Sequence, residues 1–129
     1  MPSFHDAVNT PATPEDVWKL LYDPARFPDW WAGVGTVELG REGQYTMYPD
    51  GYPDFPMAQV LATERSQQRV TVSCLVSDLR FEWRLEPIAD GTRINVEVEI
   101  PDAEAHRLDS QYELIKASIS RLAALAATG

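Results

Sequence analysis

The sequence predicts an α+β domain in which a curved, seven-stranded antiparallel sheet wraps around one long C-terminal helix, with two short helices inserted after the first strand. Three segments carry this prediction. Residues 7–31 run from a strand into helical turns, residues 33–100 alternate apolar and polar side chains between glycine-marked turns, and residues 102–127 hold neither Gly nor Pro. Strands that alternate apolar and polar residues have one buried face and one face exposed to solvent, and a helix with an apolar stripe can cover the buried face.

The first helix follows the N-terminal strand and is expected to begin at Thr13, a good N-cap, with Pro14 at its first position. Its apolar face consists of residues at helical spacing: Val17, Leu20 and Leu21. The pair Asp23-Pro24 closes this helix and opens a second, very short one. Pro28 is expected to end the second helix, because proline interrupts helical hydrogen bonding.

Two weaker hairpins are expected next, residues 33–39 with 43–48 and residues 57–64 with 69–76, both bounded by turn residues. In the first hairpin the inward side chains are expected to be Val37, Leu39, Tyr45 and Met47. In the second, one face is expected to carry Val70, Val72, Cys74 and Val76.

The clearest strands are residues 79–86 and 93–100, which alternate without interruption on either side of the turn Asp90-Gly91. Their register should place Leu85 opposite Ile94 and Trp83 opposite Val96 on the inner face. The full inward set is Phe81, Trp83, Leu85, Ile94, Val96, Val98 and Ile100. The charged residues between them are expected to face water, so Glu97 and Glu99 are interpreted as a solvated face beside Arg80 and Arg84 and not as a catalytic pair.

The last element is expected to be a helix that begins near Asp102, as a cap, and runs to about Ala127. One stripe of this helix is largely apolar and needs a sheet to lie across. The stripe consists of Leu108, Tyr112, Ile115, Ile119, Leu122 and Ala126.

This order of elements, with the pattern Pro28-Asp29-Trp30 at the end of the second helix, resembles the START-like (SRPBCC) superfamily. That group has the helix-grip fold and includes bacterial polyketide cyclase/dehydrase-like proteins and birch-pollen-allergen-type proteins. The resemblance extends over essentially the whole chain and implies one domain, residues 1–129. It also implies a hydrophobic cavity between the sheet and the long helix, which inward-facing residues would line.

Parity along the strands and the helical stripe predict which residues bind a ligand in that cavity. Trp31 and Tyr52 are expected near its mouth, whereas Trp30 is interpreted as a packing wedge. Tyr112 would supply an inward hydroxyl from the helix, and the facing of His106 is left open. The complete predicted set is Trp31, Tyr45, Met47, Tyr52, Cys74, Phe81, Trp83, Leu108, Tyr112 and Ile115.

The segment from Tyr48 to Pro56 contains three prolines, and its residues Tyr52 and Phe55 supply aromatic surface. Prolines limit the flexibility of such a segment. Two interpretations stay open: a semi-rigid flap over the cavity entrance, or an ordinary hairpin turn folded onto the body.

Composition excludes several classes of function. A net charge of −9 and a sequence pI near 4.5 argue against a nucleic-acid partner and an anionic membrane surface. The single cysteine excludes an intrachain disulfide, and His5 and His106 are in no metal-binding spacing, so neither a metal nor a cofactor is expected. No signal peptide or membrane-spanning segment is recognised. We therefore expect a cytoplasmic protein, bacterial from its preference for arginine over lysine, and a monomer or weak homodimer.

Three functions remain. The first is binding of a small, largely apolar or aromatic molecule, such as a lipid, a polyketide or a similar metabolite. The second is a polyketide aromatase/cyclase-like enzyme with cyclase or dehydratase chemistry, whose catalytic residues the sequence does not identify. The third is a protein-interaction module of the chaperone-activator or ribosome-associated toxin type, which would expose an apolar patch. The apolar inner faces, with every strand arginine outside, favour the first.

Overall fold

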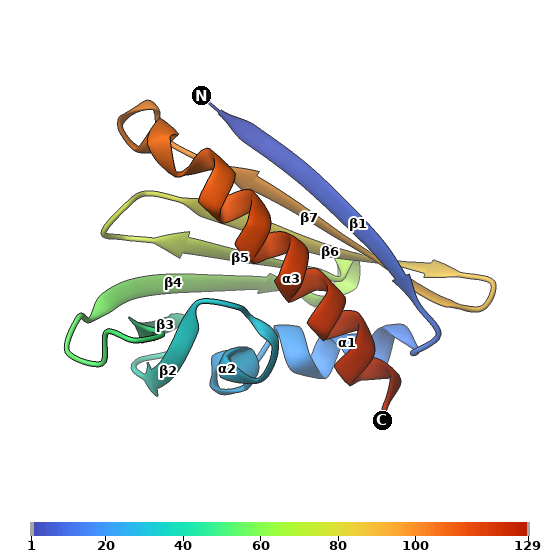
Figure 1. Ribbon diagram of the computed structural model, residues 1–129. Helices are drawn as coiled ribbons and strands as arrows, with labels where there is room; N and C mark the ends of the chain where they lie inside the picture. Colours follow the sequence, from blue (N-terminus) through green and yellow to red (C-terminus); the bar gives the residue numbers. More distant parts are fainter. Residues whose placement is uncertain (1, 129) are drawn as a thin grey trace.

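The computed structural model describes residues 2–128 and confirms the expected architecture of a long helix held across a curved antiparallel sheet (Figure 1). The sheet order is β1-β7-β6-β5-β4-β3-β2, so the first and last strands in sequence are neighbours and β2 is an outer strand. The strands are β1 (Ser3–Thr10), β2 (Val34–Leu39), β3 (Gln44–Pro49), β4 (Met57–Glu64), β5 (Arg69–Cys74), β6 (Arg80–Ile88) and β7 (Gly91–Glu99).

The helices lie on one side of the sheet. In Figure 1, α3 runs diagonally across the sheet, and the short helices lie near its C-terminal part. The helical elements are α1 (Pro14–Leu21), η1 (Pro24–Arg26), α2 (Phe27–Trp30), η2 (Arg65–Gln67), η3 (Asp102–Arg107) and α3 (Leu108–Ala127). No helix among the described residues is both long enough and apolar enough to cross a membrane.

Helix α1 begins as its sequence predicts, because the Asp16 amide donates a hydrogen bond of 3.2 Å to the Thr13 hydroxyl. The expectation for Pro28 was wrong, since Pro28 lies in the first turn of α2 and the helix continues to Trp30. Proline is tolerated there because the first amides of a helix have no intrahelical acceptor.

The hairpin of β6 and β7 has the predicted register, with Leu85 paired to Ile94 and Trp83 paired to Val96. All seven predicted inward side chains are buried. On the opposite face, the Arg80 guanidinium contacts the Glu99 carboxylate at 2.8 Å, as expected for a solvated outer surface.

The turn of this hairpin depends on Gly91, whose φ is +146°. A Cβ atom at this position would lie 2.0 Å from the carbonyl oxygen of Thr10. Only glycine can therefore let β1 approach the start of β7 so closely.

Two inward assignments at strand ends were wrong. Leu39 is 61% exposed because it lies at the end of the outer strand β2, although its pairing with Tyr45 keeps it on the expected face. Val76 is 56% exposed because β5 already ends at Cys74. A tight turn follows, in which the Asp78 amide donates to the Cys74 carbonyl at 2.9 Å.

The C-terminal helix begins later than expected. Residues 102–107 form the 3₁₀ segment η3, interrupted at Glu104, and α3 begins at Leu108. Four residues of the predicted stripe are buried: Ile115, Ile119, Leu122 and Ala126. Tyr112 is 40% exposed and meets the Phe4 ring edge-on at 5.4 Å, so it lies at the border of the helix–sheet contact and not inside it.

Candidate functional site

A partly open cavity of about 200 Å³ lies between the first half of α3 and the inner face of β3 to β6. The segment that follows α2 closes one side of it. The lining residues are Trp31, Ala32, Gly33, Val34, Tyr45, Met47, Pro49, Met57, Gln59, Cys74, Ser77, Leu79, Phe81, Arg107, Gln111 and Leu114. Most of these are apolar or aromatic, as is usual for sites that bind small organic molecules.

The sheet wall of the cavity carries a row of polar side chains across three strands. Tyr45 on β3 pairs with Gln59 on β4, and Gln59 pairs with Cys74 on β5. Ser77, in the turn after β5, also lines the cavity, and all four residues are at most 6% exposed. The sheet wall of the cavity thus presents hydroxyl, amide and thiol groups at one place.

These polar groups have few partners within the protein. The Gln59 side-chain nitrogen donates a long hydrogen bond of 3.4 Å to the Met57 carbonyl. No other described residue forms a hydrogen bond with the side-chain carboxamide of Gln59. Nor does any residue between 2 and 128 hydrogen bond to the hydroxyl of Tyr45 or of Ser77. Because buried polar groups are usually paired, such groups facing a cavity are available to a ligand or to water.

Burial raises the pKa of the Tyr45 hydroxyl well above its ordinary value, with a smaller contribution from the neighbouring Cys74 thiol. Desolvation disfavours the phenolate, so the hydroxyl keeps its proton at neutral pH. Tyr45 therefore faces the cavity as a neutral hydrogen-bond donor and acceptor, and it is unsuited to act as a base.

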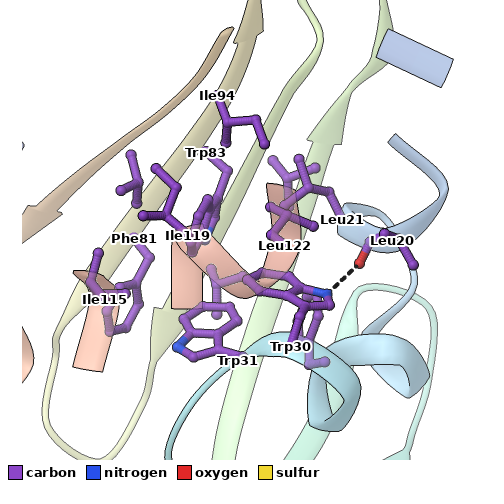
Figure 2. Close-up of a cluster of buried hydrophobic side chains, with 14 of the residues drawn as sticks. Leu20, Leu21, Trp30, Trp31, Phe81, Trp83, Ile94, Ile115, Ile119 and Leu122 are labelled. Carbon is purple, nitrogen blue, oxygen red and sulfur yellow. Dashed lines mark hydrogen bonds between the residues drawn. The ribbon is translucent and has the colours of Figure 1, made fainter. Parts of the chain in front are cut away.

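An aromatic cluster separates the cavity from the packed core. Trp31 stacks on Trp30 at 5.4 Å and meets Phe81 and Trp83 edge-on at 5.1 and 5.4 Å. Figure 2 shows these rings together, with the Trp30 indole N–H bonded to the Leu20 carbonyl at 3.0 Å. Trp30 is fully buried and acts as the expected packing wedge, whereas Trp31 lines the cavity and covers Trp83.

The helix wall is formed by Arg107, Gln111 and Leu114, which lie at positions i, i+4 and i+7. Ser118 continues this row one turn later and joins the two sides of the cavity. Its hydroxyl donates to the Leu114 carbonyl at 2.6 Å and accepts from the Ala32 amide at 2.8 Å. This bond fixes the chain after α2 against α3.

Of the predicted ligand-binding residues, the structure brings one half together at this cavity and leaves out the other half. The lining includes Trp31, Tyr45, Met47, Cys74 and Phe81. The residues that do not line it are Tyr52, Trp83, Leu108, Tyr112 and Ile115. Trp83 lies behind Trp31, and the three helix residues belong to the neighbouring face of α3, one position further along the chain than the lining row.

The loop between β3 and β4 borders the cavity through its two ends, Pro49 and Met57. Tyr52 lies within this loop and is 66% exposed. The Asp50 amide bonds the Gly33 carbonyl at 2.9 Å, which attaches the start of the loop to the cavity wall. The His106 side chain, whose facing was open, points to solvent and lies 3.7 Å from the Glu104 carboxylate.

Sequence reasoning missed four polar lining residues: Gln59, Ser77, Arg107 and Gln111. Gln59 shares parity with Met57, which would have placed it inward on β4. The lining row of the helix was not predicted because Arg107 and Gln111 are polar, and the expected inward face was identified from apolar residues alone. Within residues 2–128, no group of three or more His, Cys, Asp or Glu side chains is arranged to hold a metal ion.

A family model described as "Polyketide cyclase / dehydrase and lipid transport" matches residues 1–126. No curated protein matches the sequence.

Several solved structures share the fold at low sequence identity. XoxI from Bacillus cereus has a TM-score of 0.74 and 15% identity over 95% of this chain and 94% of its own. The di-domain aromatase/cyclase BexL of the BE-7585A biosynthetic pathway has a TM-score of 0.78 and 12% identity, over 95% of this chain and 45% of its own. Ara h 8.0201 has a TM-score of 0.69 and 13% identity over 99% of both chains. Likeness at such identities shows a common fold and nothing finer.

Proposed function

The chain belongs to the polyketide cyclase/dehydrase and lipid transport family, within the START-like (SRPBCC) superfamily, and from this we propose that it binds one small, largely aromatic molecule in the cavity between the sheet and α3. The observation that carries the proposal is the row Tyr45, Gln59 and Cys74 together with Ser77. These groups are buried at the cavity without full hydrogen bonding, among the apolar and aromatic residues that make up most of its lining.

The size of the cavity limits the ligand to about one ring. A cavity of about 150 Å³ accepts benzene, and drug-sized ligands occupy about 300–1,000 Å³. At about 200 Å³, this cavity suits a substituted single ring. Trp31, Tyr45 and Phe81 offer aromatic faces and edges, which favour an aromatic guest over a flexible chain.

Native mass spectrometry of the freshly purified protein tests this function. We expect part of the protein to carry the added mass of a small molecule. Gln111→Trp fills the cavity from α3 and should remove that mass, whereas Ser120→Trp, on the exposed side of the same helix, should retain it. Both variants place a tryptophan on α3, so the comparison separates filling of the cavity from the mere presence of a new indole on the helix.

A titration with benzyl alcohol, a neutral single-ring probe, gives a second readout by NMR. Amide shifts should change at the cavity, for example at Ala32 and Cys74, and saturate with added probe. The proposed function would be refuted if the purified protein carried no bound mass and if the probe caused no saturable shifts at these residues.

A second candidate function is an enzyme of the cyclase or dehydratase type, favoured by the neutral Tyr45 hydroxyl at the cavity wall. Such a hydroxyl would donate a hydrogen bond to a carbonyl oxygen of the substrate and stabilise negative charge that develops there. The volume of the cavity opposes a multi-ring polyketide as substrate. A conversion of substrate that is lost in Tyr45→Phe while ligand binding persists would support the enzyme.

A further inference from the structure

Among the described residues that line the cavity, Arg107 is the one with a charged side chain, and none carries a carboxylate. This is notable in a chain with 20 acidic and 11 basic residues, in which most arginines have acids as neighbours. On the described surface, for example, Arg26, Arg65 and Arg80 each form an ion pair. No residue between 2 and 128 forms an ion pair with Arg107.

Arg107 lies at the junction of η3 and α3, where it begins the row of helix residues that faces the sheet. Its side chain is half-buried, so its charge is only partly screened by water. Gln111, one turn further along α3, adds an amide on the same wall. The helix wall therefore offers hydrogen-bond donors with a positive charge, opposite the polar row of the sheet wall.

We infer that the ligand of this cavity is an aromatic acid: a single ring whose carboxylate binds Arg107 while the ring lies against Trp31 and Phe81. This inference rests on the proposed function and makes its ligand class specific. The planar guanidinium matches the two oxygens of a carboxylate, and such bonds are among the strongest in proteins. A phosphate ester carries about −1.5 to −2 charges at neutral pH, which one arginine would only partly neutralise, so a carboxylate is the better match.

The test compares two probes of nearly equal shape, phenylacetate and its neutral amide, phenylacetamide, by calorimetric or NMR titration at pH 7. We expect phenylacetate to bind roughly 10-fold more tightly or better, because bonds to an ionised partner are stronger than neutral ones. Arg107→Gln should remove this preference, with a much larger loss of affinity for phenylacetate than for phenylacetamide, whose neutral amide oxygen makes only an ordinary hydrogen bond with Arg107.

Arg84→Gln is the matched control, because it removes the same charge from the outer face of the sheet, where Arg84 contacts Glu82 at 3.1 Å. This variant should keep the preference for the acid. Three results would overturn the inference: equal binding of the two probes, a preference that survives Arg107→Gln, or an equal loss in Arg84→Gln.

The result separates this inference from the proposed function. If benzyl alcohol and phenylacetamide bind at the cavity but phenylacetate binds no more tightly than phenylacetamide, the aromatic-acid inference fails and the proposed function stands. If no ring compound binds, the inference fails as well, and the mass measurement on the purified protein then decides the proposed function by itself.

Discussion

Replacing Ser118 by alanine should weaken the attachment of the cavity wall to α3. Ser118 is fully buried, and its hydroxyl is the acceptor for the Ala32 amide at 2.8 Å. Alanine leaves that amide without its acceptor. An unsatisfied buried donor costs about 1–3 kcal/mol, and the half-buried position of Ala32 favours the lower half of this range.

Helix propensity acts in the opposite direction. Alanine is the better helix former by about 0.5 kcal/mol, which offsets part of the loss. Ser118→Ala should therefore lower the free energy of unfolding by about 0.5–1.5 kcal/mol. The control Ser120→Ala, on the exposed side of α3, receives the same propensity gain with no lost bond and should be slightly stabilised.

Urea unfolding of both variants measures this difference, and amide hydrogen exchange locates it. Exchange at Ala32 should accelerate in Ser118→Ala and stay unchanged in Ser120→Ala. Benzyl alcohol binding should weaken only in the first variant, because Ala32 lines the cavity. Equal stability of the two variants, with equal exchange at Ala32, would refute the proposed role of this bond.

Three further predictions use the core and the wall of the cavity. Trp83→Ala should lower the free energy of unfolding by about 3–5 kcal/mol in urea titrations, and Glu97→Gln by less than about 0.5 kcal/mol; a large loss for Glu97→Gln would contradict the assigned faces. Gly91→Ala should cost about 1–3 kcal/mol from backbone strain alone, and a thermal midpoint equal to that of the parent would contradict the close approach to Thr10. Because burial raises the Tyr45 pKa, the stability that its neutral form contributes is complete below about pH 10 and is lost as the pH rises above that value. Tyr45→Phe should flatten this alkaline decline in unfolding experiments, and an unchanged decline would assign it to other groups.

The sequence predicted those parts of the fold in which local pattern and tertiary packing agree. The β6–β7 hairpin alternates over its full length, so parity alone fixed both its inner face and its register. Thr13 and Pro14 likewise determined the start of α1 by local chemistry. The predictions failed for residues at or beyond strand ends, as at Leu39 and Val76. Alternation indicates which face of the sheet a residue is on, but not whether other elements still cover that face at the end of the strand.

The cavity could be predicted only in part for a related reason. The sheet wall follows parity, so Tyr45, Cys74 and Phe81 were found from the sequence. On α3, however, the apolar stripe identifies the side that packs, and the cavity lies beside the neighbouring row that begins with Arg107 and Gln111. An amphipathic helix therefore reveals its packed face through its hydrophobic period, whereas its ligand-facing row has the composition of an ordinary exposed face.

That difference between the two rows explains why the cavity persists in a small domain with a dense aromatic core. Leucines at positions 107 and 111 would favour filling the space, because they would gain apolar burial against the apolar residues of the lining. The polar groups of Arg107 and Gln111 oppose this, because burying them without hydrogen-bond partners costs free energy. The space is therefore kept open by side chains whose hydrogen bonds a guest molecule can complete. A ligand that binds only the folded chain then adds RT ln(1 + [L]/Kd) to its stability, so the thermal midpoint should rise with phenylacetate concentration in the parent and rise less in Arg107→Gln.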